Sequence, residues 1–214
     1  MIVQDVATMR YREAWTLQER LHAEVLAGGE EQLILVEHPP VITFGRRPNV
    51  AQHMLASPEQ LAKLNVEVVQ SDRGGDITFH GPGQIVAYPI VRLIDHRLSV
   101  GGYVRTLEQA VIATLADFNI EGLLDPSAIG IWVQHAGQLR KICALGVRIR
   151  RGASMHGIAL NITTDLRYFN LIVPCGLANR PVTSMHEILG PGTPGMNVVK
   201  EALARRIAEA FSVG

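Results

Sequence analysis

The segment that most restricts the fold of this 214-residue chain spans residues 73–84, with the sequence Arg-Gly-Gly-Asp-Ile-Thr-Phe-His-Gly-Pro-Gly-Gln. Four of its twelve residues are glycine. Glycine weakens the interior of a helix or strand, and it recurs where the backbone takes a positive φ or passes close to a ligand. The sequence therefore predicts a loop, a short strand and a second loop whose main chain can lie against a ligand. The segment lacks the lysine of a phosphate-binding loop, and no Gly-x-Gly-x-x-Gly pattern opens a helix here.

Composition limits the class of protein. Hydrophobic residues make up 47% of the chain and charged residues 19%, which is enough apolar material for one folded domain over residues 1–214. The formal net charge is zero, so we expect no nucleic-acid partner. Two cysteines cannot form a tetrahedral metal site alone. With no signal peptide and no apolar run near the ~20 residues of a membrane helix, the sequence predicts a soluble cytoplasmic protein.

Hydrophobic periodicity predicts an α+β fold. Apolar residues recur at helical spacing in three long segments, and a capping box with proline at the first helical position opens a shorter helix at Ser57. The expected helices span residues 9–27, 58–65, 100–118 and 198–211. The expected strands span residues 33–36, 41–44, 66–70, 84–90, 129–134, 139–149 and 155–162. Short connections among the last three strands favour an antiparallel meander, so we expect a mixed, mainly antiparallel sheet flanked by helices, with a loop at 190–197.

Cys175 is one candidate for chemistry. Pro174 precedes it and Gly176 follows it, a pattern that favours a sharp and rigid turn. A free cysteine is often a small buried hydrophobe, so the residue can be either structural or a nucleophile. Cys143 lies among apolar residues of an expected strand and is assigned to the core.

Lys141 is a second candidate. Strand alternation places Lys141 on the same side as Cys143, and if Cys143 faces the core, the lysine points inward. An inward lysine can stabilise a nearby thiolate and carry protons. The alternative is a solvated basic face shared with Arg140 and Arg150.

Further candidates lie in the glycine-rich segment and near Gly157. His80 is either a hydrogen-bonded structural group or a ligand-contacting one. Arg73 and Asp76 can pair with each other across the turn, which would contribute little if the pair is exposed. Backbone N–H groups near Gly157 can donate to an oxyanion.

Taken together, these segments resemble the lipoyl(octanoyl) transferases. The matching pieces follow in family order along most of the chain: Glu37-His38-Pro39-Pro40-Val41-Ile42-Thr43-Phe44-Gly45, residues 73–84, Lys141-Ile142-Cys143-Ala144-Leu145-Gly146, His156-Gly157-Ile158-Ala159-Leu160-Asn161, Pro174-Cys175-Gly176 and Val182-Thr183-Ser184-Met185. Each piece alone is weakly specific, whereas the set is highly specific.

The resemblance implies a fold similar to the catalytic domains of biotin and lipoate protein ligases. It implies that Cys175 carries the acyl group as a thioester and that Lys141 lowers its pKa and relays protons. It implies no metal and no cofactor, because the acyl group arrives activated. The acyl site would be lined by three segments: Arg73, Gly74, Gly75, Asp76, Ile77, Thr78, Phe79 and His80; Ala144, Leu145 and Gly146; Gly157, Ile158 and Ala159.

The implied donor is octanoyl-acyl carrier protein, and the implied acceptors are the lipoyl domains of 2-oxoacid dehydrogenases and the glycine cleavage H protein. Four alternatives stay open. An ATP-dependent lipoate–protein ligase usually carries His-Asp-x-Gly-Asn where this chain has His80-Gly81-Pro82-Gly83-Gln84. The others are an octanoyl amidotransferase, a non-catalytic acyl-binding protein and a cysteine hydrolase with a histidine beside Cys175.

Overall fold

A computed structural model describes residues 1–173 and 180–212. Its larger sheet has the strand order β1-β2-β6-β10-β9-β8-β7. All neighbouring pairs in this sheet are antiparallel except β1–β2. The strands are β1 (Ile2–Thr8), β2 (Gln32–Glu37), β6 (Gln84–Ile90), β7 (Leu123–Asp125), β8 (Ala128–His135), β9 (Gln138–Arg150) and β10 (Ala153–Asn161).

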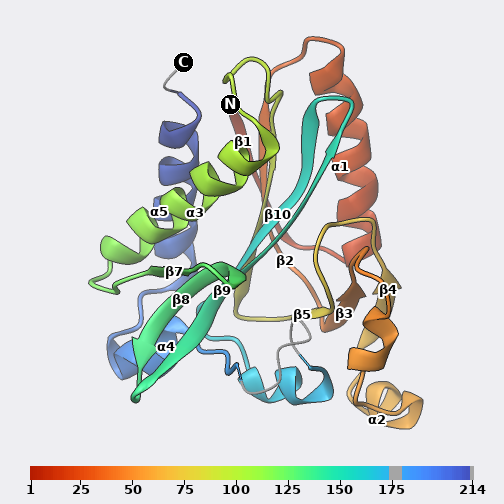
Figure 1. Cartoon of the computed structure of the whole chain (residues 1–214), viewed down its shortest axis with the longest axis vertical. Helices are drawn as coiled ribbons and strands as arrows, with labels where there is room; N and C mark the ends of the chain where they lie inside the picture. The colour runs from red at the N-terminus through yellow and green to blue at the C-terminus, as the bar shows by residue number, and fades with distance from the viewer. Residues whose placement is uncertain (174–179, 213–214) are drawn as a thin grey trace.

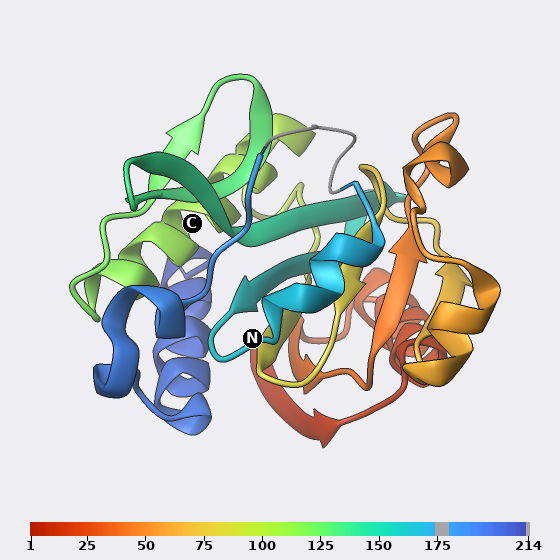
Figure 2. The ribbon, with the colours of Figure 1, turned by 90° about the horizontal axis from the view of Figure 1, so that it is seen from below.

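A smaller sheet has the order β4-β3-β5 and pairs β3 with β4 in parallel and with β5 antiparallel. Its strands are β3 (Val41–Phe44), β4 (Glu67–Gln70) and β5 (Thr78–His80). β5 is the short strand expected inside the glycine-rich segment. Seen from below, this sheet and the helix α2 (Pro58–Lys63) lie at the opposite side of the molecule from the β8–β9 hairpin (Figure 2).

Helices cover both faces of the larger sheet (Figure 1). α1 (Tyr11–Leu26) packs on β6 and β10 and buries Ala14, Leu21 and Val25. On the other face, α3 (Val100–Ala116) and α5 (Met196–Ala210) pack against each other and against the sheet, over the largest apolar core. A short helix α4 (Met185–Leu189) precedes α5. In the described part of the chain, 3₁₀ segments form at η1 (Val50–His53), η2 (Leu166–Leu171) and η4 (Gly190–Gly192).

The expected class is confirmed, since the structure is α+β with a mixed, mainly antiparallel sheet flanked by helices. The capping box is present, with the Ser57 hydroxyl accepting from the Gln60 N–H and the Gln60 side chain from the Ser57 N–H. The meander β8–β9–β10 is antiparallel, and Ala136 and Gly137 form its first turn with positive φ, as two-residue hairpins require. Within the described residues, no helix combines the length and apolar character needed to cross a membrane.

The expected bounds of the last loop and helix are wrong, and one strand was not expected. The 190–197 loop contains a 3₁₀ turn, and α5 begins at Met196 rather than at residue 198. β1 was not expected; it lies at the sheet edge with most of its residues exposed, so its sequence lacks the alternation that identifies a half-buried strand.

The alternation argument for Lys141 is also wrong, although its conclusion holds. Trp132 pairs with Lys141 but Ile131 pairs with Cys143, so Ile142 is an extra residue on β9. Such a bulge interrupts the alternation of side chains. Lys141 consequently shares a face with its partner Trp132, and Cys143 shares the opposite face with Ile131 in the core. Lys141 still points inward and is only 6% exposed.

Candidate active site

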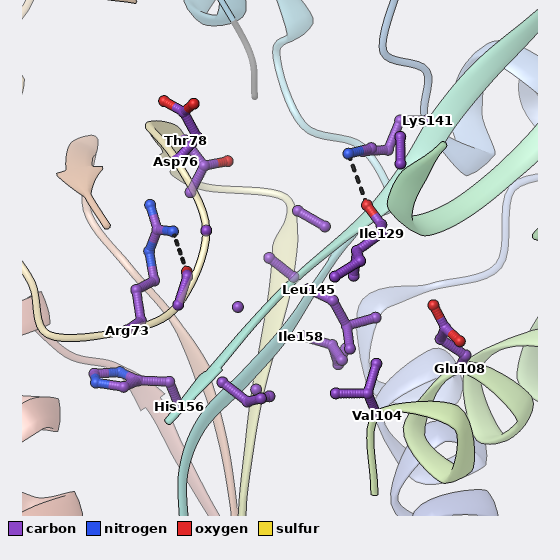
Figure 3. A pocket seen from close by; sticks show the side chains of 18 of the residues that line it. Arg73, Asp76, Thr78, Val104, Glu108, Ile129, Lys141, Leu145, His156 and Ile158 are labelled. Carbon is purple, nitrogen blue, oxygen red and sulfur yellow. Dashed lines mark hydrogen bonds between the residues drawn. The ribbon is translucent and has the colours of Figure 1, made fainter. Parts of the chain in front are cut away.

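A pocket of about 870 Å³ opens between the glycine-rich segment and the antiparallel meander (Figure 3). Its walls come from the segment 73–80, from β6, α3, β9 and β10, and from the connection between β7 and β8. Apolar side chains line the middle, where Figure 3 shows Leu145 and Ile158 at the centre, Arg73 on one side and Lys141 on the other, with Val104 below them near Glu108. A pocket with an apolar middle and a few charged groups at its walls suits a small organic ligand.

The glycine-rich segment forms one wall because it lies directly on β9. The Gly74 N–H donates to the Val147 carbonyl at 2.9 Å, and a Cβ at Gly74 would meet that oxygen at 2.9 Å. Gly75 has a φ of +86°. The glycines therefore let the segment approach the sheet backbone and turn. Glycine is thus needed here for packing against β9, in addition to the contact with a ligand that the sequence predicts.

Arg73 and Asp76 are held by different partners. The Arg73 guanidinium donates to the Thr43 carbonyl at 2.7 Å, to the Thr43 hydroxyl and to the Gly74 carbonyl. The Asp76 carboxylate accepts hydrogen bonds from His53 Nδ1 at 2.7 Å and from the backbone N–H of Ile77. Arg47 Nη1 lies 3.4 Å from its second oxygen. These contacts fix both side chains in the pocket wall. They replace the ion pair between Arg73 and Asp76 that the sequence analysis considered.

Buried rings form the deep end of the pocket. Tyr11 stacks on His80 and on His156, with ring centroids 5.9 Å and 6.5 Å apart, and His38 and Tyr88 pack against the same group. Burial lowers the pKa of His38 to about 4 and the pKa of His80 well below 6.5. These imidazoles are consequently neutral at pH 7, and they present uncharged ring faces.

His80 begins a directed series of hydrogen bonds, which we call the amide chain (His80, Gln84, Asn161 and Thr183). The Gln84 Nε2 group donates to the Phe79 carbonyl at 3.2 Å, which fixes the orientation of the amide. Gln84 Oε1 therefore faces His80 Nδ1 at 2.8 Å, and this nitrogen must carry the proton. His80 Nε2 is left as an acceptor, 3.5 Å from the Thr43 hydroxyl.

The amide chain continues to the strand that carries Lys141. Gln84 Nε2 also donates to Asn161 Oδ1 at 2.9 Å, and Asn161 Nδ2 donates to the Thr183 carbonyl at 3.0 Å. The Thr183 N–H donates to the Lys141 carbonyl at 2.8 Å. Every side chain in this series is at most 5% exposed, so unsatisfied groups here would be costly.

Lys141 occupies the opposite wall of the pocket from Arg73 (Figure 3). Its ammonium donates to the Ile129 carbonyl at 2.9 Å and lies 4.7 Å from the centroid of the Trp132 ring. A carbonyl accepts hydrogen bonds from an amino group, and the face of an aromatic ring attracts a cation, so both contacts hold the Lys141 side chain in the pocket wall.

Cys175 lies outside the described residues, but the chain on either side of 174–179 is held near the pocket. The Val173 N–H donates to the His53 carbonyl at 2.7 Å, and His53 binds the pocket residue Asp76. On the other side, Arg180 forms an ion pair with Asp125, and residues 181–183 pair with Lys141 in a parallel β-bridge.

Of the sequence-predicted site residues that the structure describes, which exclude Cys175, all but one line the same pocket. Lys141 and the three predicted substrate segments line the same pocket. The exception is Phe79, which faces the small core near η2 and stacks on Tyr168 with ring centroids 4.7 Å apart. The alternation of β5 explains this, because Thr78 and His80 share one side of the strand and Phe79 the other.

Sequence reasoning missed Tyr11, His156 and Glu108, all of which line the pocket. The tyrosine and the glutamate lie on helices α1 and α3, far in sequence from the other site residues, and carried no local signal. His156 did have a local sequence signal, because it directly precedes Gly157 in a segment that was predicted to line the site. Among the described residues, no group of three or more His, Cys, Asp or Glu side chains could hold a metal ion.

Comparison with known proteins adds independent information. Residues 10–208 match the family model of the lipoyl protein ligase A/B catalytic domain. A protein of Chloroflexus aurantiacus named octanoyltransferase is 44% identical over 215 residues, which cover all of this chain and 95% of that protein.

Solved structures share the fold at low sequence identity. A lipoate-protein ligase A bound with ATP superposes with a TM-score of 0.80 at 16% identity, covering 99% of this chain and 85% of that one. The biotin protein ligase of Aquifex aeolicus gives a TM-score of 0.54 at 13% identity, covering 99% of this chain and 69% of that one. Both confirm the expected likeness to ligase catalytic domains, and at this identity they concern the fold alone.

Proposed function

The chain belongs to the lipoyl protein ligase A/B catalytic-domain family, and from this premise we propose that it transfers an octanoyl or lipoyl group from acyl carrier protein to the lysine of a lipoyl domain through a thioester on Cys175. The protein is an acyltransferase related to octanoyltransferases. The observation that carries the mechanistic part is the buried ammonium of Lys141, which lies in the wall of a pocket built from the predicted acyl-binding segments.

The first half-reaction moves the acyl group onto the enzyme. The Cys175 thiolate attacks the thioester carbonyl of the donor, and the tetrahedral intermediate collapses with expulsion of the donor thiolate. The Lys141 ammonium stabilises the attacking thiolate and then gives its proton to the departing sulfur. One thioester replaces another, so the step is nearly balanced in energy and needs no ATP.

The second half-reaction moves the acyl group to the acceptor. Lys141, now neutral, accepts a proton from the acceptor ammonium, and the resulting amine attacks the acyl-enzyme carbonyl. The tetrahedral intermediate collapses to an amide as its nitrogen releases its remaining extra proton to solvent, the Cys175 thiolate leaves, and Lys141 is again an ammonium. The cycle therefore returns both residues to their starting protonation states, which is a reason for a lysine rather than an arginine at this position.

The pocket supports an acyl chain as the transferred group. Val104, Leu145 and Ile158 offer an apolar path, and the neutral rings of Tyr11 and His80 close the deep end without charge. Transfer of an eight-carbon chain from water to such a surface is favourable by ~0.8 kcal/mol for each buried CH₂ group.

The test is an intact-mass measurement after incubation with octanoyl-acyl carrier protein. We expect a mass increase of one octanoyl group, its loss in Cys175→Ala, and its retention in the control Cys143→Ala. Burial raises the pKa of the Cys143 thiol to about 12, so this second thiol is protonated and buried. An adduct that persists in Cys175→Ala would overturn the proposal.

A second measurement separates transferase from ligase. We expect no lipoyl-domain modification from free octanoate with ATP and Mg²⁺, and efficient modification from octanoyl-acyl carrier protein. Activity only with free octanoate and ATP would assign the chain to the ligase reaction instead.

A further inference from the structure

A trough of small residues forms the floor of the pocket on the side of α1. Ala144 pairs with Ala159 across β9 and β10, and Gly146 pairs with Gly157 in the same register. Ala144 and Ala159 pack with the apolar cluster beneath α1, and strand alternation places Gly146 on the same face of β9 as Ala144. All four residues line the pocket. Because glycine and alanine carry such short side chains, an aliphatic chain can lie along the two strands here.

Lys141 and His156 lie at the two ends of this trough. Lys141 comes before Ala144 on β9, and His156 pairs with Val147, the residue that follows Gly146. The strand advances by ~20 Å from Lys141 to Val147, at ~3.3 Å for each residue. Figure 3 shows Lys141 and His156 on opposite sides of the pocket. A chain that starts beside the lysine and follows the trough therefore ends against His156.

The His156 imidazole is held from two directions. Its Nε2 lies 2.6 Å from Asp72 Oδ1, and Asp72 also forms an ion pair with Arg148. The backbone N–H of His156 donates to Gln18 Oε1 at 2.7 Å. A carboxylate only accepts, so Nε2 carries the proton, and a hydrogen bond to a charged acceptor is among the strong ones. The imidazole, at 1% exposure, can consequently move aside for a ligand only by losing this bond.

Tyr11 supports the imidazole from α1. The two rings are stacked, with centroids 6.5 Å apart and an interplanar angle of 7°. The Tyr11 hydroxyl shares a hydrogen bond with Ser71 Oγ at 2.8 Å, and this oxygen also accepts from the Arg73 N–H at 3.3 Å. The loop that carries Arg73 and the helix that carries Tyr11 thus fix the second ring as well.

The backbone of His156 is strained. Its φ is +57° within β10, in the left-handed region that residues other than glycine rarely adopt. Strained residues persist where the surrounding contacts hold them in place, and such positions cluster at ligand sites. Here the contacts of the imidazole and of the N–H hold the residue at the end of the pocket.

From this geometry we propose that the stacked rings of His156 and Tyr11 limit the length of the acyl pocket and so favour octanoyl over longer acyl groups. The inference rests on the proposed function, in which Lys141 acts on the sulfur that carries the acyl chain. An extended octanoyl chain covers ~8 Å, since the three bonds of one extended residue advance by ~3.5 Å. A decanoyl chain reaches ~2 Å further by the same measure, toward rings that their hydrogen bonds hold in place.

The kinetic test compares octanoyl- and decanoyl-acyl carrier protein as donors, with the adduct followed by intact mass. In wild type we expect decanoyl capture to be at least about tenfold slower, because one methylene in an apolar pocket changes rates by ~10–200-fold. His156→Gly removes the imidazole and suits the positive φ. In this variant decanoyl capture should come within about twofold of octanoyl capture. A wild-type ratio in His156→Gly would overturn the length limit.

Three variants separate the ring from other effects. Asn119→Gly is the matched control, because this exposed residue after α3 also has a positive φ, of +60°, and should keep the wild-type ratio. Tyr11→Phe keeps both rings and should keep the preference for octanoyl. His156→Asn shortens the side chain in a residue type that tolerates this φ, and it should give an intermediate ratio. This variant replaces His156→Gly if thermal unfolding shows that the glycine variant does not fold.

A binding measurement does not depend on acyl transfer. Calorimetry with Cys175→Ala compares free octanoate and decanoate as ligands. In an open pocket the two additional CH₂ groups of decanoate would tighten binding about tenfold. We expect decanoate to bind no more tightly than octanoate, and the gain of about tenfold to appear once His156→Gly is added.

Failure of the two proposals can be told apart. If wild type forms the octanoyl adduct and captures decanoyl equally fast, the length limit is wrong and the proposed function stands. If wild type forms no adduct but the calorimetry gives the expected pattern, the proposed function is wrong and the length limit stands. If wild type forms no adduct and neither acid binds, both are wrong.

Discussion

The buried His38 makes a measurable contribution to the pH dependence of stability. Its Nδ1–H donates to the Met9 carbonyl at 2.7 Å, and its Nε2 lies 2.9 Å from the Tyr88 hydroxyl. In the neutral ring the hydroxyl donates to this nitrogen. With burial as the main cause, the pKa is lowered to about 4.

The sign follows from proton binding in the two states. Between about pH 4 and pH 6.5, an unfolded histidine is protonated while the folded one is neutral, so acid favours the unfolded chain. The contribution is fully present above pH 6.5 and is lost as the pH falls toward 4. From pH 7 to pH 5 this residue alone should lower the free energy of unfolding by about 1.8 kcal/mol.

Urea unfolding at pH 7 and pH 5 tests the prediction. In His38→Gln, which retains one donor and one acceptor, the pH 7 to pH 5 loss should be about 1.8 kcal/mol smaller than in wild type. Tyr88→Phe should keep the loss, because the ring stays buried and Nε2 then has no acceptor for a second proton. An unchanged pH dependence in His38→Gln would refute the assignment of a neutral, buried His38.

Three further predictions concern single positions. Gly130→Ala should destabilise the fold by about 1–3 kcal/mol and reduce octanoyl capture, because its Cβ meets the Cys143 carbonyl; thermal unfolding and single-turnover rates measure both. Asn161→Asp should cost about 1–3 kcal/mol in urea unfolding, since a carboxylate would face the Thr183 carbonyl, whereas Asn170→Asp at an exposed site should not. Ser57→Ala should cost about 1 kcal/mol through loss of the cap and leave acyl transfer unchanged.

Much of the fold could be predicted because most elements have a buried face. The apolar residues at helical spacing in segment 9–27 include Ala14, Leu21 and Val25, which α1 buries. The strands β3 and β6 have the predicted bounds. β1 could not be predicted, since an exposed edge strand needs no apolar pattern. The bulge at Ile142 also gave no signal, because a run of apolar residues hides which side chain faces which layer.

The site was predictable where its residues are contiguous in sequence. Motif segments such as 144–146 and 157–159 reach the same pocket because β9 and β10 are adjacent in the sheet. Tyr11 and Glu108 were out of reach of such reasoning, since helices on opposite faces of the sheet bring them to the pocket. Their roles depend on tertiary packing, which no local pattern encodes.

The amide chain has a consequence for sequence variation. Each member donates toward the next in one direction, from His80 through Gln84 and Asn161 to Thr183, and the backbone carbonyls of Phe79 and Thr183 fix that direction. Gln84→Glu or Asn161→Asp would bring oxygen acceptors into contact, and no change at the other position could reverse the series, because the carbonyls of Phe79 and Thr183 each need a donor. We therefore expect a library randomised at both positions to retain an amide at each.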